Sequence, residues 1–152
     1  MRELAAGTLP HIKLAACLVQ DCAFIEGLVR LLAGQVAYAP SLPDPLPGAQ
    51  FLGVIGGPEN TYFQRCFDEL KVPTNLRAAP ELTPTAKSFQ ATMVAAVETR
   101  RYEQKLAVLV GVEWSYLAWA RPYVGRVESW PFIYGEWIAL EWVFFEENYA
   151  TA

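Results

Sequence analysis

Glu113 is an acidic residue in an apolar stretch, a position from which a carboxyl group can do acid–base chemistry. It interrupts the run from Leu106 to Ala120, which is otherwise almost wholly apolar. If this run is helical, the residues beside Glu113 are all apolar or aromatic: Leu106, Leu109, Val110, Tyr116, Leu117 and Ala120. An ionised carboxylate in such surroundings costs several kcal/mol unless it is paired or protonated. We therefore expect a raised pKa for Glu113 and regard it as a candidate functional group.

Asp21 has the same kind of environment on a second predicted helix. Its neighbours at helical spacing are Cys17, Leu18, Phe24, Ile25 and Leu28. Two helices thus each direct one carboxylate inward. One interpretation is structural, in which both acids pair with buried donors such as Arg30, Tyr116 or an indole N–H and fix helix register. The other is a site for a flat nitrogenous ligand, which Tyr116 and Trp114 would hold by stacking and the carboxylates would recognise.

Composition excludes several classes of protein. The chain has 152 residues, of which 53% are hydrophobic, so we expect one globular domain over residues 1–152. The 12 basic and 16 acidic residues form no basic stripe, so no nucleic acid partner is expected. No apolar run approaches the roughly 20 residues that span a bilayer, and no signal peptide is visible. We therefore expect no membrane association and a soluble, cytoplasmic protein.

Cysteine and histidine usage argues against disulfides, metals and haem. The three cysteines, Cys17, Cys22 and Cys66, contain no CxxC pair and are expected to be reduced, small buried hydrophobes. The single histidine, His11, cannot supply the imidazoles of a non-haem iron site. We therefore expect no metal and no cofactor.

The apolar periodicity predicts an all-α fold. Helices are expected near residues 11–34, 49–55, 58–70, 84–99 and 106–120, with a last one near 129–148. Gly34 is expected to stop the first helix, and Gly56-Gly57 to separate the second from the third. Prolines predict loops over 38–48 and around 73–80. No stretch alternates strictly enough to indicate a strand.

Four short motifs resemble the TenA family of thiamin-salvage enzymes. They are Gly7-Thr8-Leu9, Gln20-Asp21, Trp114-Ser115-Tyr116 and Tyr134-Gly135-Glu136-Trp137-Ile138, in the family's order and at similar spacing. The resemblance implies a haem oxygenase-like helical bundle with a deep pocket for a 4-aminopyrimidine. It also implies a homo-oligomer, a dimer or a tetramer, and hydrolytic release of an amine.

The resemblance also assigns substrate-binding residues. Asp21 matches the aspartate that binds the ring nitrogen and amino group of the pyrimidine. Tyr116 matches the tyrosine of the central helix, and Tyr134 that of the Tyr-x-Glu-Trp-Ile motif. Phe24 and Phe89 stand where phenols often occur in the family, so they would hold the ligand by stacking alone.

The position of the family's nucleophile separates two classes of TenA-like protein. The main class has a cysteine where this chain has Val112, whereas a second class has a glutamate one position further on, where Glu113 stands. The second class is associated with hydrolysis of N-formyl-aminomethylpyrimidine or of 4-amino-5-aminomethyl-2-methylpyrimidine. Glu113 would then activate a water. Glu141 resembles the family's returning glutamate but follows Ile138 closely, so we expect a segment to be missing near 138–141.

Three other functions remain open at this stage. A non-catalytic protein that binds a small aromatic or pyrimidine compound could use the same pocket. A metal or haem enzyme of the same fold is disfavoured by the lone histidine. A helical interaction protein is disfavoured because two buried acids serve no obvious packing purpose.

Overall fold

The computed structural model describes residues 8–120, and in this part of the chain every regular element is a helix. The elements are α2 (His11–Ala37), α3 (Leu46–Val54), a π-helix (Ile55–Glu59), α4 (Asn60–Glu69), α5 (Thr74–Ala78), α6 (Pro84–Glu98) and α7 (Tyr102–Ala120). The predicted all-α class is therefore confirmed. The helix expected near 129–148, with Tyr134 and Glu141, and the junction near 138–141 lie outside the described residues.

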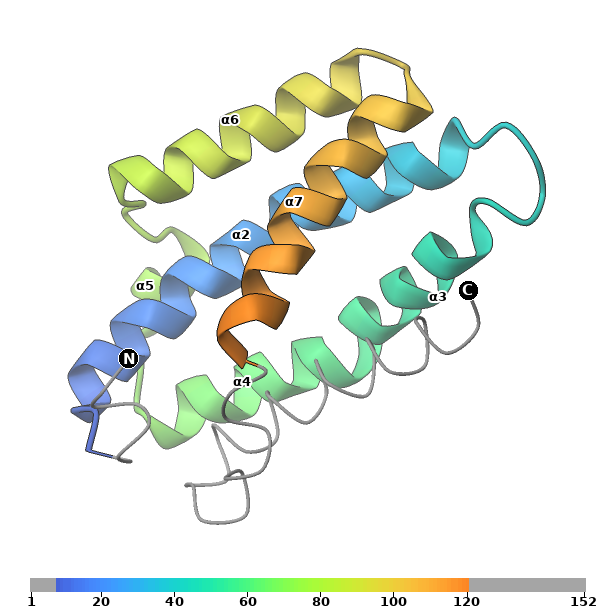
Figure 1. Ribbon diagram of the computed structural model, residues 1–152. Helices are drawn as coiled ribbons and strands as arrows, with labels where there is room; N and C mark the ends of the chain where they lie inside the picture. Colours follow the sequence, from blue (N-terminus) through green and yellow to red (C-terminus); the bar gives the residue numbers. More distant parts are fainter. Residues whose placement is uncertain (1–7, 121–152) are drawn as a thin grey trace.

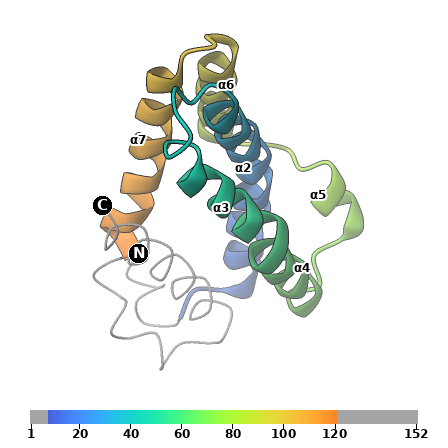
Figure 2. The same ribbon diagram turned by 90° about the vertical axis from the view of Figure 1, so that its right-hand side faces the viewer.

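The long helix α2 is the centre of the arrangement. It packs against α3, α4, α6 and α7. Figure 1 shows α2 between α6 and the arm formed by α3 and α4, and α7 crossing it. The turned view places α7 on one side of α2 and the short α5 on the other (Figure 2). A side chain on α2 can therefore meet residues from both of the later helices, α6 and α7.

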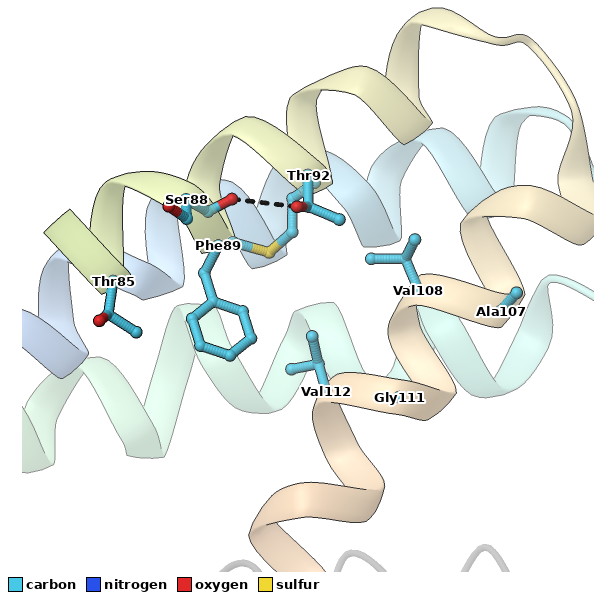
Figure 3. Close-up of a pocket in the computed structure, with 9 residues that line it drawn as sticks. Thr85, Ser88, Phe89, Thr92, Ala107, Val108, Gly111 and Val112 are labelled. Atoms are coloured by element: carbon cyan, nitrogen blue, oxygen red, sulfur yellow. Dashed lines mark hydrogen bonds between the residues drawn. The ribbon is translucent and has the colours of Figure 1, made fainter.

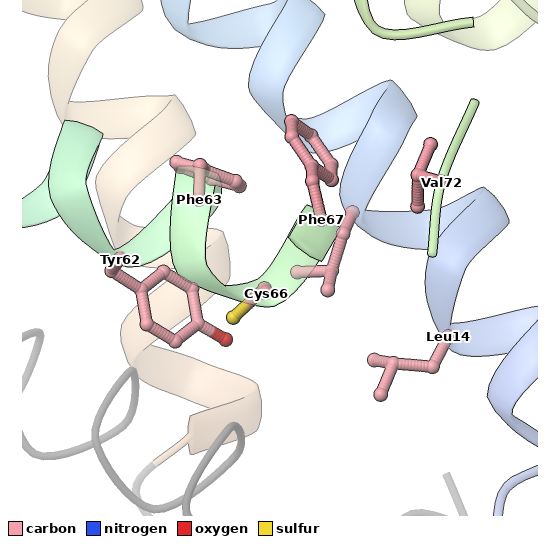
Figure 4. Packing of buried hydrophobic residues seen from close by; sticks show 7 residues of the cluster. Leu14, Tyr62, Phe63, Cys66, Phe67 and Val72 are labelled. Atoms are coloured by element: carbon pink, nitrogen blue, oxygen red, sulfur yellow. The ribbon is translucent and has the colours of Figure 1, made fainter. Parts of the chain in front are cut away.

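Two apolar clusters fix α2 in this position. The first, at its N-terminal end, combines Leu14, Leu18, Tyr62, Phe63, Cys66, Phe67 and Val72 (Figure 4). The second, nearer its C-terminal end, combines Leu28, Leu31, Leu32, Phe51, Ile55, Met93 and Ala96. Each large side chain buried in this way contributes about 1.5–3 kcal/mol. Because Asp21 and Phe24 lie between the two clusters in sequence, the rotation of α2 about its axis is fixed where they stand.

The prediction that Gly34 ends the first helix is wrong, since α2 continues to Ala37. Gly34 is required for packing instead. A Cβ atom at this position would lie 2.8 Å from Cε of Lys105, a fully buried side chain whose ammonium group lies 4.6 Å from the centre of the Tyr38 ring. The glycine therefore makes room for a cation–π contact between α7 and the end of α2.

The predicted break at Gly56-Gly57 is also wrong, because α3 continues through the π-helix directly into α4 (Figure 1). The glycines have open space around them, and they remain within the helical arm. Pro58 follows them, and proline cannot donate the backbone hydrogen bond of an α-helix interior. The wider π turn accommodates such an interruption without ending the helix.

Candidate functional site

Asp21 of α2 and Tyr116 of α7 meet at the centre of the candidate site. The Tyr116 hydroxyl donates a hydrogen bond to Asp21 Oδ1 at 2.5 Å, and both residues are partly buried. Removal from water raises the pKa of Asp21 from its ordinary 3.8 to about 6, although the bond from Tyr116 lowers it. This carboxyl group therefore changes its charge just below neutral pH.

Three aromatic rings from three helices form a connected group, and one of them, Tyr116, bonds to this carboxyl group. The rings of Phe24 (α2) and Phe89 (α6) meet edge to face, with centres 6.0 Å apart and planes at 84°. Phe24 also contacts the Tyr116 ring, with centres 6.2 Å apart and planes at 39°. Four of the substrate-binding residues expected from the sequence, Asp21, Phe24, Phe89 and Tyr116, are thus brought together by the fold.

Gln90 positions the Phe89 ring against the Phe24 ring. Its side-chain Nε2 donates to the carbonyl oxygen of Ala23 at 2.9 Å, which ties α6 to α2. Phe89 directly precedes Gln90, and Phe24 directly follows Ala23, so this hydrogen bond joins the two helices next to the contact between the two rings. Sequence reasoning missed this residue, because a single polar side chain on a helix leaves no periodic pattern.

Gln20 fixes the start of α6 in a similar way. Its Nε2 donates to the Glu81 carbonyl at 3.0 Å, and its Oε1 accepts from the Thr83 N–H at 2.9 Å. Thr83 is in turn the N-cap of α6, since its hydroxyl accepts from the N–H of Ala86 at 3.2 Å. The Gln20-Asp21 motif therefore combines a residue that positions α6 with a residue that faces α7.

Glu113 and its neighbours on α7 differ in exposure. Val112 is buried, Glu113 is partly buried, and Trp114 is 60% exposed. The idea that Trp114 helps to hold a ligand by stacking is therefore not supported. Glu113 lies three residues before Tyr116, so both side chains are on neighbouring positions of one helical face. Glu113 and the tyrosine that bonds to Asp21 are therefore neighbours on α7.

The purely structural interpretation of Asp21 named Arg30 and Tyr116 as partners. Arg30 instead donates to Glu26 at 2.5 Å on the surface. Tyr116 is a partner of Asp21, which both interpretations allow. Desolvation outweighs this bond in its effect on the pKa of Asp21, so the charged form is held at a cost. Such a cost is expected where a carboxylate is kept for binding or chemistry.

The three cysteines are free, but they are not equally buried. Cys66 is buried, Cys22 is intermediate, and Cys17 is exposed, so the expectation of three buried cysteines is wrong for Cys17. Although the residue as a whole is exposed, its thiol is partly shielded from water, and this desolvation and the charge of Asp21, one turn further along α2, raise the pKa of the Cys17 thiol. This environment disfavours the thiolate that a nucleophile requires.

Residues 8–120 contain neither a cluster of metal ligands nor a membrane-spanning helix. Within this range, His, Cys, Asp and Glu side chains do not gather in threes around a point that a metal ion could occupy. None of the helices described there combines the length and hydropathy that a bilayer span requires.

The fold and the site define an all-α protein with an acidic, aromatic-walled site between three helices. A sequence model of the TENA/THI-4/PQQC family matches residues 1–143, and the chain belongs to this family. Membership associates it with thiamin salvage or a related activity, in a family that is generally enzymatic. No curated protein matches the chain in a direct sequence comparison.

Proposed function

We propose that this protein hydrolyses an aminopyrimidine derived from thiamin, either N-formyl-aminomethylpyrimidine or 4-amino-5-aminomethyl-2-methylpyrimidine. The observation that carries the proposal is the Asp21 carboxyl group, bonded to Tyr116 beside the rings of Phe24 and Phe89. The flat aromatic side chains favour stacking of a flat heterocycle, and the carboxyl group can hydrogen-bond to adjacent nitrogen atoms on the edge of that heterocycle. We also propose that the chain belongs to the glutamate class of its family, since Val112 cannot act as a nucleophile.

Asp21 would recognise the ligand in a protonation-dependent way. As a carboxylate it accepts from the exocyclic amino group and from a protonated ring nitrogen, whereas as a carboxylic acid it donates to a neutral ring nitrogen. Because its pKa is about 6, both forms are accessible at modest cost. Tyr116 would hold one carboxyl oxygen, and Tyr134 would contribute a second phenol.

Glu113 would act as the general base in a reaction without a covalent intermediate. It takes a proton from a water, and the water oxygen bonds to the formyl carbon as the carbonyl becomes a tetrahedral oxyanion. Collapse of this intermediate breaks the C–N bond, and Glu113 or Glu141 protonates the departing amine, giving formate and aminomethylpyrimidine. With the unformylated substrate, water attacks the carbon that carries the amine and ammonia leaves. The Tyr134 hydroxyl would stabilise the developing charge, since the hydroxyl hydrogen of Tyr116 is donated to Asp21.

A pair of amide variants tests these roles on the whole chain. Glu113→Gln should retain ligand binding in calorimetry and lose release of formate or ammonia, since an amide cannot accept the proton. Asp21→Asn should weaken binding by about tenfold or more, as expected when a charged hydrogen bond is lost. Wild-type turnover by purified Glu113→Gln on both substrates would refute the assignment of the base.

A non-catalytic pyrimidine-binding protein is the second candidate. The observation in its favour is Val112, a buried aliphatic residue where the main class of the family carries its nucleophile. The same experiments separate the candidates, because binding without release of formate or ammonia by the wild-type chain supports the binding protein.

We also propose that the protein is a homo-oligomer, a dimer or a tetramer. Leu106, Val110 and Trp114 are spaced four residues apart on α7 and are 37%, 53% and 60% exposed. Residues at this spacing form a stripe along one side of a helix, and an exposed apolar stripe is typical of an interface. Light scattering on wild type and on Val110→Glu tests it, since a charge in the stripe should dissociate the assembly.

A further inference from the structure

The start of α7 is held to the end of α2 by two polar contacts. The Gln35 side chain of α2 donates from Nε2 to the hydroxyl of Tyr102, the first residue of α7, at 3.2 Å. Lys105 is fully buried, and its ammonium group lies 4.6 Å from the centre of the Tyr38 ring. Its Nζ also donates to the Arg101 carbonyl at 3.5 Å. A buried ammonium group that left these partners would lose its compensation for desolvation, so the contact holds the start of α7 at one place on α2.

These contacts and the Asp21–Tyr116 bond lie at matching positions on two helices that run in opposite directions. Asp21 and Gln35 are 14 residues apart on α2, and Tyr102 and Tyr116 are also 14 residues apart on α7. Fourteen residues make nearly four turns and about 21 Å of helix, so side chains at this spacing share nearly the same face. One face of α7 is thus tied to one face of α2 at two places, and displacement of the helix at one place moves it at the other.

The packing of α7 against α6 is less specific. Val108 and Val112 point from α7 toward α6 (Figure 3), and a cavity of about 360 Å³ lies between the two helices there. Over residues 102–116 of α7, the buried side chains are those of Lys105 and Val112. Apolar burial is non-directional and tolerates a small slide of one helix along another, whereas a buried charge fixes register through its partner. Lys105 is therefore the buried residue of this range that can set the position of α7 along α2.

Gly34 of α2 leaves the gap through which the Lys105 side chain reaches the Tyr38 ring. An added Cβ at Gly34 would lie 2.8 Å from Cε and 3.3 Å from Cδ of Lys105, and 3.7 Å from Cγ1 of Val97 on α6. The aliphatic stem of Lys105 thus lies in a narrow space between three helices. A slide of α7 by one residue, about 1.5 Å, would carry the stem away from this gap.

We propose that Lys105 is a positioning residue for the candidate site. With its ammonium group held by the Tyr38 ring and its stem over Gly34, it fixes the place of α7 along α2 and keeps the Tyr116 hydroxyl on the Asp21 carboxyl group. It acts through Tyr116, because it lies 11 residues before it, about 16 Å of helix. The effect on the hydrogen bond is independent of the substrate, whereas the effect on ligand binding rests on the proposed function.

NMR of the full chain without ligand tests the positioning role through Tyr38. This residue is 42% exposed, so its replacement removes the ring without emptying the core. The ¹³Cζ resonance of Tyr116 is assigned by its absence in Tyr116→Phe. In Tyr38→Leu it should move toward its position in Asp21→Ala, where the acceptor is missing, and in Tyr38→Phe, which keeps the ring, it should stay at the wild-type position. An unmoved resonance in Tyr38→Leu would overturn the proposal.

Two controls separate positioning from loss of charge and from loss of stability. Lys105→Ala should move the Tyr116 resonance in the same direction as Tyr38→Leu, whereas Lys87→Ala, at an exposed lysine of α6, should leave it in place. Val72→Ala removes buried volume from the first apolar cluster, which combines α2 and α4 with Val72. It should lower stability in urea unfolding without moving the resonance. Movement in Val72→Ala as large as in Tyr38→Leu would show that the resonance follows stability alone, and the proposal would fail.

Calorimetry with 4-amino-5-aminomethyl-2-methylpyrimidine measures the effect on the site. Wild type and Tyr38→Phe should bind it equally, and Tyr38→Leu about three- to tenfold more weakly, the loss expected for one hydrogen bond. In a Tyr116→Phe background, Tyr38→Leu should have no further effect, because the residue through which Lys105 acts is changed. A further loss there, or equal binding by wild type and Tyr38→Leu, would overturn the proposal. If wild type does not bind the pyrimidine although Tyr38→Leu moves the Tyr116 resonance, the proposed function fails and the positioning role is retained.

Discussion

Replacement of Asp21 by asparagine should make the folded protein more stable at neutral pH while it weakens ligand binding. Asparagine keeps an oxygen that can accept from the Tyr116 hydroxyl, but it carries no charge to desolvate. The pKa of Asp21 is about 6 in the folded chain against an ordinary 3.8. At about 1.4 kcal/mol for each pH unit, the ionised carboxylate costs the folded state about 3 kcal/mol. This value is the upper limit of the stability that Asp21→Asn should gain.

The stability of the wild type should fall relative to that of Asp21→Asn as the pH rises. Because folding raises this pKa, the carboxyl group favours the folded state most below pH 3.8, and that contribution is lost as the pH rises through about 6. Between about pH 5.5 and pH 7.5 the group should lower the free energy of unfolding of the wild type by about 1 kcal/mol. The stability of Asp21→Asn should not show this decrease with pH. A lower pH is avoided because the sequence has an isoelectric point of about 5.0.

Urea unfolding, followed by tryptophan fluorescence, gives the free energy of unfolding of wild type and Asp21→Asn at the two pH values. Carboxyl ¹³C titration of aspartate-labelled protein should show one resonance with a midpoint near 6, absent in Asp21→Asn. In Tyr116→Phe this midpoint should move higher, because the phenol's hydrogen bond favours the carboxylate. If Asp21→Asn is instead less stable than wild type by the same amount at both pH values, Asp21 is a structural partner and the functional reasoning is refuted.

Three further substitutions test the packing that supports the site, each by urea unfolding. Gly48→Ala should destabilise the folded protein by about 1–3 kcal/mol, because its Cβ would lie too close to Oε1 of the buried Gln35 side chain. The control, Gly53→Ala on the same helix, should stabilise it by about 0.5–1 kcal/mol. Equal effects of the two substitutions would contradict the packing argument. Lys71→Gly should stabilise the folded protein by about 0.5–1 kcal/mol, since Lys71 has a left-handed φ of 53° just after α4. A loss of stability would show that the backbone at Lys71 is not strained. Gln20→Leu should lower the free energy of unfolding by about 1–2 kcal/mol, because two hydrogen bonds are lost, and it should speed amide hydrogen exchange at the start of α6. Gln20→Glu keeps the acceptor and should lower the free energy of unfolding less. Unchanged exchange in both variants would show that the contact does not hold α6.

The helices were predictable wherever one face of a helix packs on a core. The repeated apolar positions of α2 and the proline that opens α6 placed the starts of both elements correctly. The short α5 was missed because it buries none of its residues, so no apolar periodicity marks it. The join between α3 and α4 was missed because glycine and proline usually interrupt a helix, and the π turn that tolerates them has no comparable sequence signal.

The site was predictable in its members but not in its contacts. The residue pattern singled out Asp21 as a carboxyl group in apolar surroundings and named Tyr116 among its possible donors, and the family resemblance added Phe24 and Phe89. No periodicity could show that Tyr116 bonds to a residue 95 positions earlier. Gln90 was invisible for a related reason, since its partner is a backbone carbonyl, and any residue type at that position would supply one.

The adjacent pair Gln20-Asp21 shows why the motif needs both residues in this order. Successive side chains on a helix point about 100° apart, so the two reach different neighbours. Gln20 binds the segment that opens α6, while Asp21 binds Tyr116 on α7. A second glutamine, Gln90, ties α6 to α2 next to the aromatic rings. Both later helices are thus bonded to α2 around a carboxyl group that they help to desolvate. Its raised pKa is therefore a property of the assembled helices, and an oriented acid of this kind is already in place when a ligand arrives.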